Sequence, residues 1–285
     1  MTPDAFTTIR FTGWSDYKNF TDQLSENWAF RGQSNATWNL RNAIERTDFI
    51  KLHKGIEAEF VAEFQRGARN YLSKDELPEH LIEWLALMQH HGAPTRLLDF
   101  TKSPFIASYF AFEQCEGMEE GHVAIWAINF NFLRTKALDL LSSELEEDIR
   151  LNKNLINERL FEKIFYHYNR SLVFPVEPFR MNRRYSLQQS IFLSTGTSAE
   201  PFMSQLAFPG DEVKKAVLKM ELPAHLQKEV LRDLQRMNLN RASLFPDLDG
   251  YAASLRLRYD SMKTPEEVIQ HQIKLLEDPA FGLFP

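Results

Sequence analysis

Residues 88–112, MQHHGAPTRLLDFTKSPFIASYFAF, place polar side chains first and apolar side chains second. The polar half brings hydroxyl, guanidinium and carboxylate groups together, at Thr95, Arg96, Asp99, Thr101 and Ser103. A guanidinium beside hydroxyl groups can bind a phosphate or another anion, and the free N–H groups at the start of a buried helix favour the same ligand. A structural alternative stays open, in which the hydroxyls cap a helix and Asp99 pairs with Arg96.

The adjacent histidines His90 and His91 do not predict a metal site. On a helix they point about 100° apart, so they cannot chelate one ion as a pair four residues apart would. Histidines near a helix C-terminus also favour the helix dipole, which is the structural interpretation of the pair. We expect no metal here, and His91 is kept as a candidate ligand contact.

The elements that must position these groups follow from apolar periodicity and turn signals. Strands are predicted at 27–33, 95–100, 122–130, 186–195 and 216–223. Helices are predicted at 56–72, 78–91, 104–112, 136–168, 224–239 and 264–277. The helix that follows Ser103 begins at Pro104 and is apolar almost all round, so we expect it to be buried.

Helices and strands are interspersed without regular βαβ alternation, which favours the α+β class. The prediction is a single compact domain with a mixed, mostly antiparallel sheet flanked by helices. It divides the chain into an N-terminal flank (1–24), the domain (25–260) and a C-terminal helix packing on it (261–285).

Composition lowers the weight of several classes of protein. The formal net charge is −6, which lowers the weight of general nucleic-acid binding. The single cysteine, Cys115, cannot form an internal disulfide and fits a reducing compartment. No secretory signal and no apolar stretch near the ~18 residues of a membrane span is visible. We therefore expect a cytoplasmic protein with no membrane partner.

Four blocks of the sequence resemble the FRG domain family, named for its Phe/Tyr-Arg-Gly motif. The blocks are FRGQ (30–33), QHHGAPTRLLDFTKSPFIASYFAF (89–112), RYSLQQSIF (184–192) and LFPDLDG (244–250), in the usual order of the family. The segment 25–260 is identified as an FRG domain on these blocks. Ser190 departs from the pattern, which usually has Gly after the paired glutamines. Many members are bacterial or phage proteins, and the resemblance implies a toxin or antiviral-defence effector.

The resemblance also implies that Arg31, Arg96, Asp99 and either Gln188 or Gln189 converge on one polar cleft. An Arg-Gly pair at a strand end lets the guanidinium enter a cleft while the backbone passes close to a ligand. A glutamine amide both donates and accepts hydrogen bonds, which suits an amide or a base edge.

The chain is also similar, more weakly, to the Arg-Ser-Glu class of ADP-ribosyltransferases. In that class an arginine holds the phosphates or ribose of NAD and a serine orients the nicotinamide ribose. These roles would fall on Arg31 and on Thr101 or Ser103. The class also uses a later Glu to stabilise the oxocarbenium-like transition state. That Glu is not found, because the corresponding segment, QQSIFLSTGT, carries neutral glutamines. Glu177 and Glu200 are the acids nearby.

The residue types and these resemblances together define the predicted site. The candidate catalytic residues are Arg31, Thr101, Ser103 and Gln188. The candidate residues for binding a nucleotide such as NAD are Arg31, Gln33, His91, Thr95, Arg96, Asp99 and Gln189. Two functions stay open: NAD-dependent ADP-ribosyl transfer, and a non-catalytic sensing module. The ligand would be a nucleotide or dinucleotide, and the target or partner a protein or nucleic acid.

Overall fold

The computed structural model describes residues 6–47, 55–115, 120–142, 158–178, 183–207 and 212–260, with 269, 270 and 273. The chain divides into two compact units, Met1–Leu239 and Asn240–Pro285. The boundary between the two units, after Leu239, lies inside the segment 25–260 that is predicted to be one domain.

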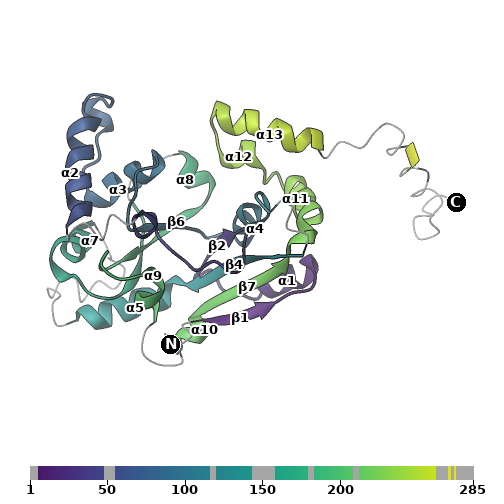
Figure 1. Ribbon diagram of the computed structural model, residues 1–285, viewed down its shortest axis with the longest axis horizontal. Helices are drawn as coiled ribbons and strands as arrows, with labels where there is room; N and C mark the ends of the chain where they lie inside the picture. The colour runs from purple at the N-terminus through teal and green to yellow at the C-terminus, as the bar shows by residue number, and fades with distance from the viewer. Residues whose placement is uncertain are drawn as a thin grey trace. The chain divides into compact units, whose positions relative to one another are not determined.

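The first unit contains a seven-stranded sheet in the order β1-β7-β4-β2-β3-β6-β5 (Figure 1). Its strands are β1 (Thr7–Arg10), β2 (Trp28–Gln33), β3 (Leu97–Thr101), β4 (His122–Asn129), β5 (Val173–Val176), β6 (Ser190–Thr195) and β7 (Val217–Pro223). Only the pairing of β1 with β7 is parallel among the strand pairs of the described residues. The expected mixed, mostly antiparallel sheet is therefore confirmed.

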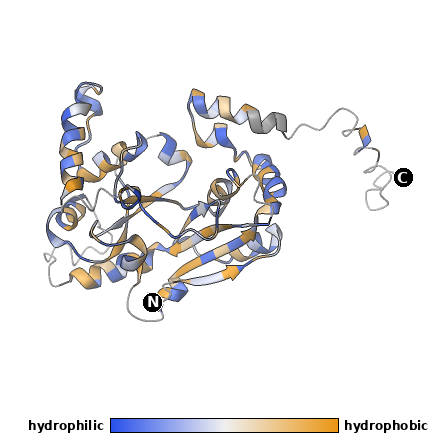
Figure 2. Cartoon of the chain, viewed as in Figure 1, coloured by the Kyte–Doolittle hydropathy of each residue, from blue (hydrophilic) through white to orange (hydrophobic). Residues whose placement is uncertain are grey.

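Helices and short helical turns connect these strands. Those of the first unit are α1 (Trp14–Thr21), η1 (Ile44–Arg46), α2 (Ile56–Ala68), η3 (Lys74–Glu76), α3 (Leu81–His90), α4 (Pro104–Phe112), α5 (Phe130–Leu141), α7 (Glu158–Lys163), η4 (Ile164–Tyr168), α8 (Arg183–Leu187), α9 (Phe202–Leu206), α10 (Glu212–Ala216), η5 (Ala224–Leu226) and α11 (Gln227–Arg236). Figure 2 shows hydrophobic and hydrophilic residues side by side on α2, as expected for an amphipathic helix.

Helix α4 packs against β2 and β4 on one face of the sheet. It is buried along most of its length, as its apolar sequence predicts. Ser103 is its N-cap and accepts a hydrogen bond from the N–H of Ile106 at 3.3 Å, while Pro104 is the first helical residue.

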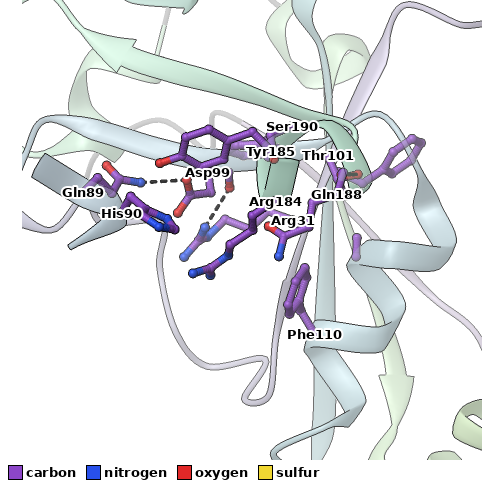
Figure 3. A pocket seen from close by; sticks show the side chains of 14 residues that line it. Arg31, Gln89, His90, Asp99, Thr101, Phe110, Arg184, Tyr185, Gln188 and Ser190 are labelled. Carbon is purple, nitrogen blue, oxygen red and sulfur yellow. Dashed lines mark hydrogen bonds between the residues drawn. The ribbon is translucent and has the colours of Figure 1, made fainter. Parts of the chain in front are cut away.

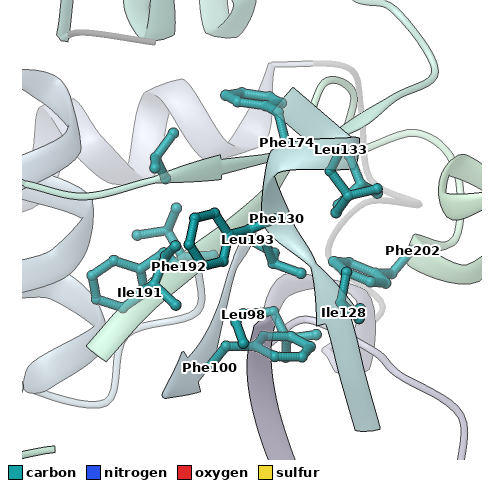
Figure 4. Close-up of a cluster of buried hydrophobic side chains, with 14 of the residues drawn as sticks. Leu98, Phe100, Ile128, Phe130, Leu133, Phe174, Ile191, Phe192, Leu193 and Phe202 are labelled. Carbon is teal, nitrogen blue, oxygen red and sulfur yellow. The ribbon is translucent and has the colours of Figure 1, made fainter. Parts of the chain in front are cut away.

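A large hydrophobic core contains the side chains of Ala124, Trp126 and Ile128, which alternate along one face of β4. Figure 4 shows part of this core, where aromatic and aliphatic side chains from β3, β4, β5, β6, α5 and α9 meet. The labelled residues are Leu98, Phe100, Ile128, Phe130, Leu133, Phe174, Ile191, Phe192, Leu193 and Phe202. Together with α4 on the other side of β2 and β4, this core fixes the positions of the central strands.

Strands β2 and β3 are paired at a single position, Phe30 with Thr101. Elsewhere β2 follows β4 over its whole length, while β3 pairs with β6 from Leu97 to Thr101. The two halves of the sheet therefore separate beyond Phe30, and the backbone groups of Arg31 and Asp99 that face this gap are not joined in a ladder.

Several element boundaries differ from the prediction. The helix expected from Pro78 begins at Leu81, because Glu83 Oε2 accepts a hydrogen bond from the His80 N–H at 3.4 Å and His80 is the N-cap. The strand expected from residue 186 begins at Ser190. Helix α8 precedes it, and Gln189 adopts a left-handed conformation with φ of 48°, which ends the helix.

The second unit contains α12 (Arg241–Leu244) and α13 (Leu248–Asp260). Asp247 Oδ1 accepts a hydrogen bond from the N–H of Gly250 at 2.6 Å at the start of α13. The sequence LFPDLDG thus contains the start of α13, where Asp247 accepts a hydrogen bond from a main-chain N–H of the first turn. The helix predicted at 264–277 and much of 136–168 lie outside the described residues. Within the described residues, no helix has the length and hydropathy needed to cross a membrane.

Candidate functional site

A pocket of about 220 Å³ lies where β2 and β3 separate (Figure 3). Its walls come from β2, the C-terminal turn of α3, β3, α4, α8 and the start of β6. The polar residues that line it are Arg31, Gln89, His90, Asp99, Thr101, Arg184, Tyr185, Gln188 and Ser190. The remainder are Phe30, Gly32, Phe100, Ala107 and Phe110.

Arg31 bridges the gap between the two strands. Its Nη1 donates a hydrogen bond of 2.7 Å to the main-chain oxygen of Asp99. The side chain thereby satisfies a carbonyl that the separation of β2 from β3 leaves without a ladder partner. Burial lowers the pKa of Arg31, while the negative charge of Asp99 acts in the opposite direction. A guanidinium nonetheless remains protonated at neutral pH.

Arg31 has unused capacity to donate hydrogen bonds. The bond to Asp99 is the one it makes among the described residues, and its Nε is buried without a partner. A guanidinium carries five N–H donors, and an unmet buried donor is costly. Such a group is suited to an incoming acceptor such as a phosphate or carboxylate oxygen.

The guanidinium of Arg184 lies next to that of Arg31 in the pocket (Figure 3). Among the described residues that line the pocket, Asp99 is the carboxylate that faces these two cations. Two adjacent guanidinium groups favour the binding of an anion.

Four of the predicted site residues, Arg31, Asp99, Thr101 and Gln188, line the pocket together. The Thr101 hydroxyl is buried and donates a hydrogen bond of 2.7 Å to the main-chain oxygen of Gln188, so it joins β3 to the chain before β6. Ser103 caps α4 and Gln189 is exposed, and neither lines the pocket among the residues described.

Arg96 lies elsewhere, in a buried ion pair. Its Nε donates a 2.7 Å hydrogen bond to Glu57 Oε2, and its guanidinium lies 4.1 Å from the ring centre of Phe165. The alternative pairing of Asp99 with Arg96 is wrong, because Glu57 on α2 supplies the partner carboxylate. A carboxylate 39 residues away in sequence gives no local signal of this contact.

Gly32 is required by packing against a helix rather than by a ligand. A Cβ atom added there would overlap the main-chain oxygen of Ala107 and lie 2.6 Å from the nitrogen of Ala111. The expected close passage of the backbone thus exists, but its partner is α4. The neighbouring Gln33 side chain points away to Trp126, whose Nε1 donates to Gln33 Oε1 at 2.7 Å.

The other predicted residues make local contacts. Thr95 is buried and donates a 2.6 Å hydrogen bond to Gln89 Oε1, and His91 is exposed after α3. Glu177 pairs with Lys102 at 2.7 Å, and Glu200 accepts a hydrogen bond from Ser171 at 2.6 Å. Neither acid is among the described residues of the pocket wall.

Sequence reasoning missed Gln89, His90, Arg184, Tyr185 and Ser190 as lining residues. All five lie inside the quoted blocks 89–112 and 184–192, so those blocks held the signal. Burial raises the pKa of Tyr185, and the charge of Asp99 raises it further. The Tyr185 hydroxyl donates a 2.7 Å hydrogen bond to the Ala86 oxygen and anchors α8 to α3. A group of three or more His, Cys, Asp or Glu side chains that could hold a metal is absent from the described part of the chain.

Residues 26–120 match the family model of the FRG domain. No curated protein and no solved structure gave a significant match to the chain. The matched residues include β2, α3, β3 and α4, and therefore Arg31, Gln89 and Asp99 of the pocket. Arg184 and Gln188 lie outside the match. The chain thus contains an FRG domain, and its matched segment supplies the larger part of the pocket wall.

Proposed function

We propose that the pocket between β2 and β3 binds the phosphate-bearing part of a nucleotide. The proposal rests on the environment of Arg31. Its Nη1 is held by a 2.7 Å hydrogen bond to the main-chain oxygen of Asp99, and its remaining N–H donors are unused beside a second arginine, Arg184. These two guanidinium groups provide the charge-assisted hydrogen bonds that a phosphate requires.

The uncharged part of the wall suits the remainder of a nucleotide. Phe110 and Tyr185 present aromatic rings, and Gln188 is an amide-bearing residue of the same wall. Aromatic faces bind bases by stacking, and an amide can pair with a base or nicotinamide edge. The volume of about 220 Å³ lies below the ~300–1,000 Å³ of pockets for drug-sized ligands. One half of a dinucleotide such as NAD would be enclosed while the other half lies outside.

The test measures ligand binding to the purified protein in two ways. Calorimetry gives the Kd, and thermal unfolding gives the stabilisation of the folded state. The ligands are AMP, ADP-ribose, NAD and inorganic phosphate. A ligand at 100 times its Kd stabilises the folded state by about 2.7 kcal/mol. We expect stabilisation by the nucleotides, and at least a tenfold weaker Kd in Arg31→Ala, because charge-assisted hydrogen bonds are worth about 1.5–3 kcal/mol.

The matched control is Arg10→Ala, which removes a surface arginine paired with Glu221 on β1 and β7. Arg31→Lys retains the charge but loses the fork of donors, so its Kd should lie between those of Arg31→Ala and the unaltered protein. If no nucleotide stabilises the protein, or if Arg10→Ala and Arg31→Ala weaken binding equally, the proposal fails.

ADP-ribosyl transfer is the second candidate function, and the position of Asp99 in the pocket wall favours it. The reaction breaks the bond between nicotinamide and ribose and needs negative charge near the sugar. Asp99 is a carboxylate already in the pocket wall beside Arg31, whereas Glu177 and Glu200 are paired elsewhere. Release of nicotinamide from NAD, abolished in Asp99→Asn, would support transfer. Bound but intact NAD would identify a sensing module instead.

The expected role as a toxin or defence effector can be tested in the same series. Growth of bacterial cells that express the unaltered protein, Arg31→Ala or Arg10→Ala would be compared. Inhibition that Arg31→Ala relieves and Arg10→Ala does not would connect the pocket with toxicity.

A further inference from the structure

A chain of hydrogen bonds leads from the backbone of β3 to the carboxylate of Asp99. The N–H of Leu97 donates to Thr95 Oγ1 at 3.3 Å, and the Thr95 hydroxyl donates to Gln89 Oε1 at 2.6 Å. Gln89 Nε2 then donates to Asp99 Oδ1 at 2.7 Å (Figure 3). Every link has a fixed direction, because a backbone N–H can only donate and a carboxylate can only accept.

This chain fixes the amide of Gln89. The Thr95 hydroxyl accepts a hydrogen bond from the N–H of Leu97 and donates its own proton to Gln89 Oε1. The amide NH₂ group must then face Asp99. The reversed amide would place its oxygen against the carboxylate oxygen of Asp99, so the carboxylate sets the orientation of the amide. Thr95 is fully buried, which keeps water from replacing it in the chain.

Asp99 is consequently held with one carboxylate oxygen engaged. The other oxygen, Oδ2, has no hydrogen-bond partner among the described residues, and the side chain borders the pocket. The residue thus offers a positioned acceptor to a ligand that carries O–H or N–H donors. The main-chain oxygen of Asp99 also accepts the hydrogen bond from Arg31. The free carboxylate oxygen of Asp99 therefore lies beside the proposed phosphate contact.

We propose that Asp99, positioned by Gln89, accepts a hydrogen bond from a ribose hydroxyl and makes the pocket selective for ribonucleotides over deoxyribonucleotides. The inference rests on the proposed nucleotide-binding function and specifies its ligand class. In a 5′-nucleotide the sugar, rather than the base, is bonded to the phosphate. An acceptor beside the phosphate-binding arginine therefore meets the sugar hydroxyls.

The first experiment needs no variant. Calorimetry of the full chain would compare AMP with 2′-deoxy-AMP and 3′-deoxy-AMP. A site built to bind a hydroxyl rejects the analogue that lacks it, because its own polar group is left unpaired. We expect at least one deoxy ligand to bind about 10- to 100-fold more weakly than AMP, as for the loss of a hydrogen bond to a charged group.

Two variants assign the selectivity to these residues. Asp99→Asn removes the charge and retains the shape of the side chain. In this variant the Kd for AMP should rise to that of the deoxy ligand that the unaltered protein binds weakly. The Kd of that deoxy ligand should itself change little. Gln89→Leu retains Asp99 but removes its positioning contact, and it should reduce the ratio between the two Kd values. Gln23→Leu, at an exposed position after α1, is the matched control and should leave the ratio unchanged.

The outcomes separate this inference from the function on which it rests. Equal Kd values for AMP and both deoxy ligands in the unaltered protein would overturn the inference and leave nucleotide binding intact. Selectivity that survives in Asp99→Asn would also overturn it. Absence of binding by every nucleotide would overturn the proposed function and this inference together.

Discussion

Arg31 and Arg96 are both predicted site residues, but they lie in different environments. Arg31 borders the pocket, and Arg96 lies in a buried ion pair. Arg96 has about 5% of its surface exposed and is paired with Glu57, with a further hydrogen bond of 3.3 Å to the Thr195 oxygen. Arg31 makes one hydrogen bond among the described residues and borders the pocket. A buried guanidinium that is paired with a buried carboxylate stabilises the fold, whereas one that borders a pocket and has donors to spare can bind a ligand.

We predict that Arg96→Ala destabilises the protein by about 3–5 kcal/mol, because it leaves the buried carboxylate of Glu57 without its partner. Urea denaturation would measure the change. Arg66→Ala is the control, since Arg66 pairs with Glu63 on the surface of α2 and should change stability by less than about 1 kcal/mol. The double variant Arg96→Met/Glu57→Leu should be more stable than Arg96→Ala. Equal stability of Arg96→Ala and Arg66→Ala would contradict the assignment.

The thiol of Cys115 should be unreactive in the folded protein. Burial raises its pKa to about 11, so very little thiolate, the reactive species, exists at pH 7 or 8. A colorimetric thiol reagent should label the native protein slowly and the urea-denatured protein fast. Rapid labelling without denaturant would show that the segment around Cys115 opens readily.

The residue types of the site could be predicted from sequence, but their partners could not. Arg31, Asp99, Thr101 and Gln188 line the pocket as a group. The resemblance implies that Arg96 converges with them, yet its partner is Glu57 on α2. Side-chain direction alternates along a strand, whereas the choice of a distant partner is made by tertiary packing.

At the scale of elements, the pocket exists because β2 and β3 separate after one pair of residues. Local pattern predicts both strands, since each is a short apolar run. The divergence depends on β2 following β4 and β3 following β6. Those pairings join segments far apart in sequence, so periodicity predicts the strands and not the gap between them.

We predict that Gly32→Ala disrupts the contact between β2 and α4. The added Cβ would overlap backbone atoms of Ala107 and Ala111, and backbone cannot move as a flexible side chain does. The cost should be at least that of overpacking in a core, about 1–3 kcal/mol. Urea denaturation would measure it, with nucleotide binding as a second readout.

Gly67→Ala is the matched control for this substitution. Gly67 lies within α2, and a Cβ there meets no atom within 4 Å. Alanine favours helix over glycine by about 1 kcal/mol, so this variant should be slightly more stable than the unaltered protein. If both substitutions changed stability in the same direction, the close approach of β2 and α4 would not be the cause.

At the scale of the first unit, elements that precede β2 contribute to the sheet and to the helices beside it. Strand β1 pairs with β7 through Thr7–Arg10 and residues 218–221. Trp14 and Lys18 of α1 both bind Asp233 of α11, at 2.7 and 2.9 Å. A parallel pairing between segments more than 200 residues apart leaves no trace in local sequence pattern, so periodicity does not predict it.

Asp233 connects the two ends of this unit through its charge. The hydrogen bond from Lys18, and to a smaller extent that from Trp14, lowers the pKa of Asp233. The pKa of an unfolded Asp side chain is about 3.9. A carboxyl group with a lowered pKa in the folded state stabilises the protein above its unfolded pKa. That contribution is lost as the pH falls through the folded pKa.

We therefore predict that Asp233→Asn lowers stability at pH 7 by about 1 kcal/mol, a value reduced from that of a buried charged pair because the contact is partly exposed. The difference from the unaltered protein should shrink below pH 4 and vanish in stronger acid, where both carry a neutral group. Urea denaturation at pH 7, 4 and 2.5 would measure it, with the exposed Asp22→Asn as the control. A difference that stayed constant with pH would mean that Asp233 acts through shape and not through charge. The contact between α1 and α11 would then hold equally well in acid, and the N-terminal elements would remain docked wherever the sheet itself is folded.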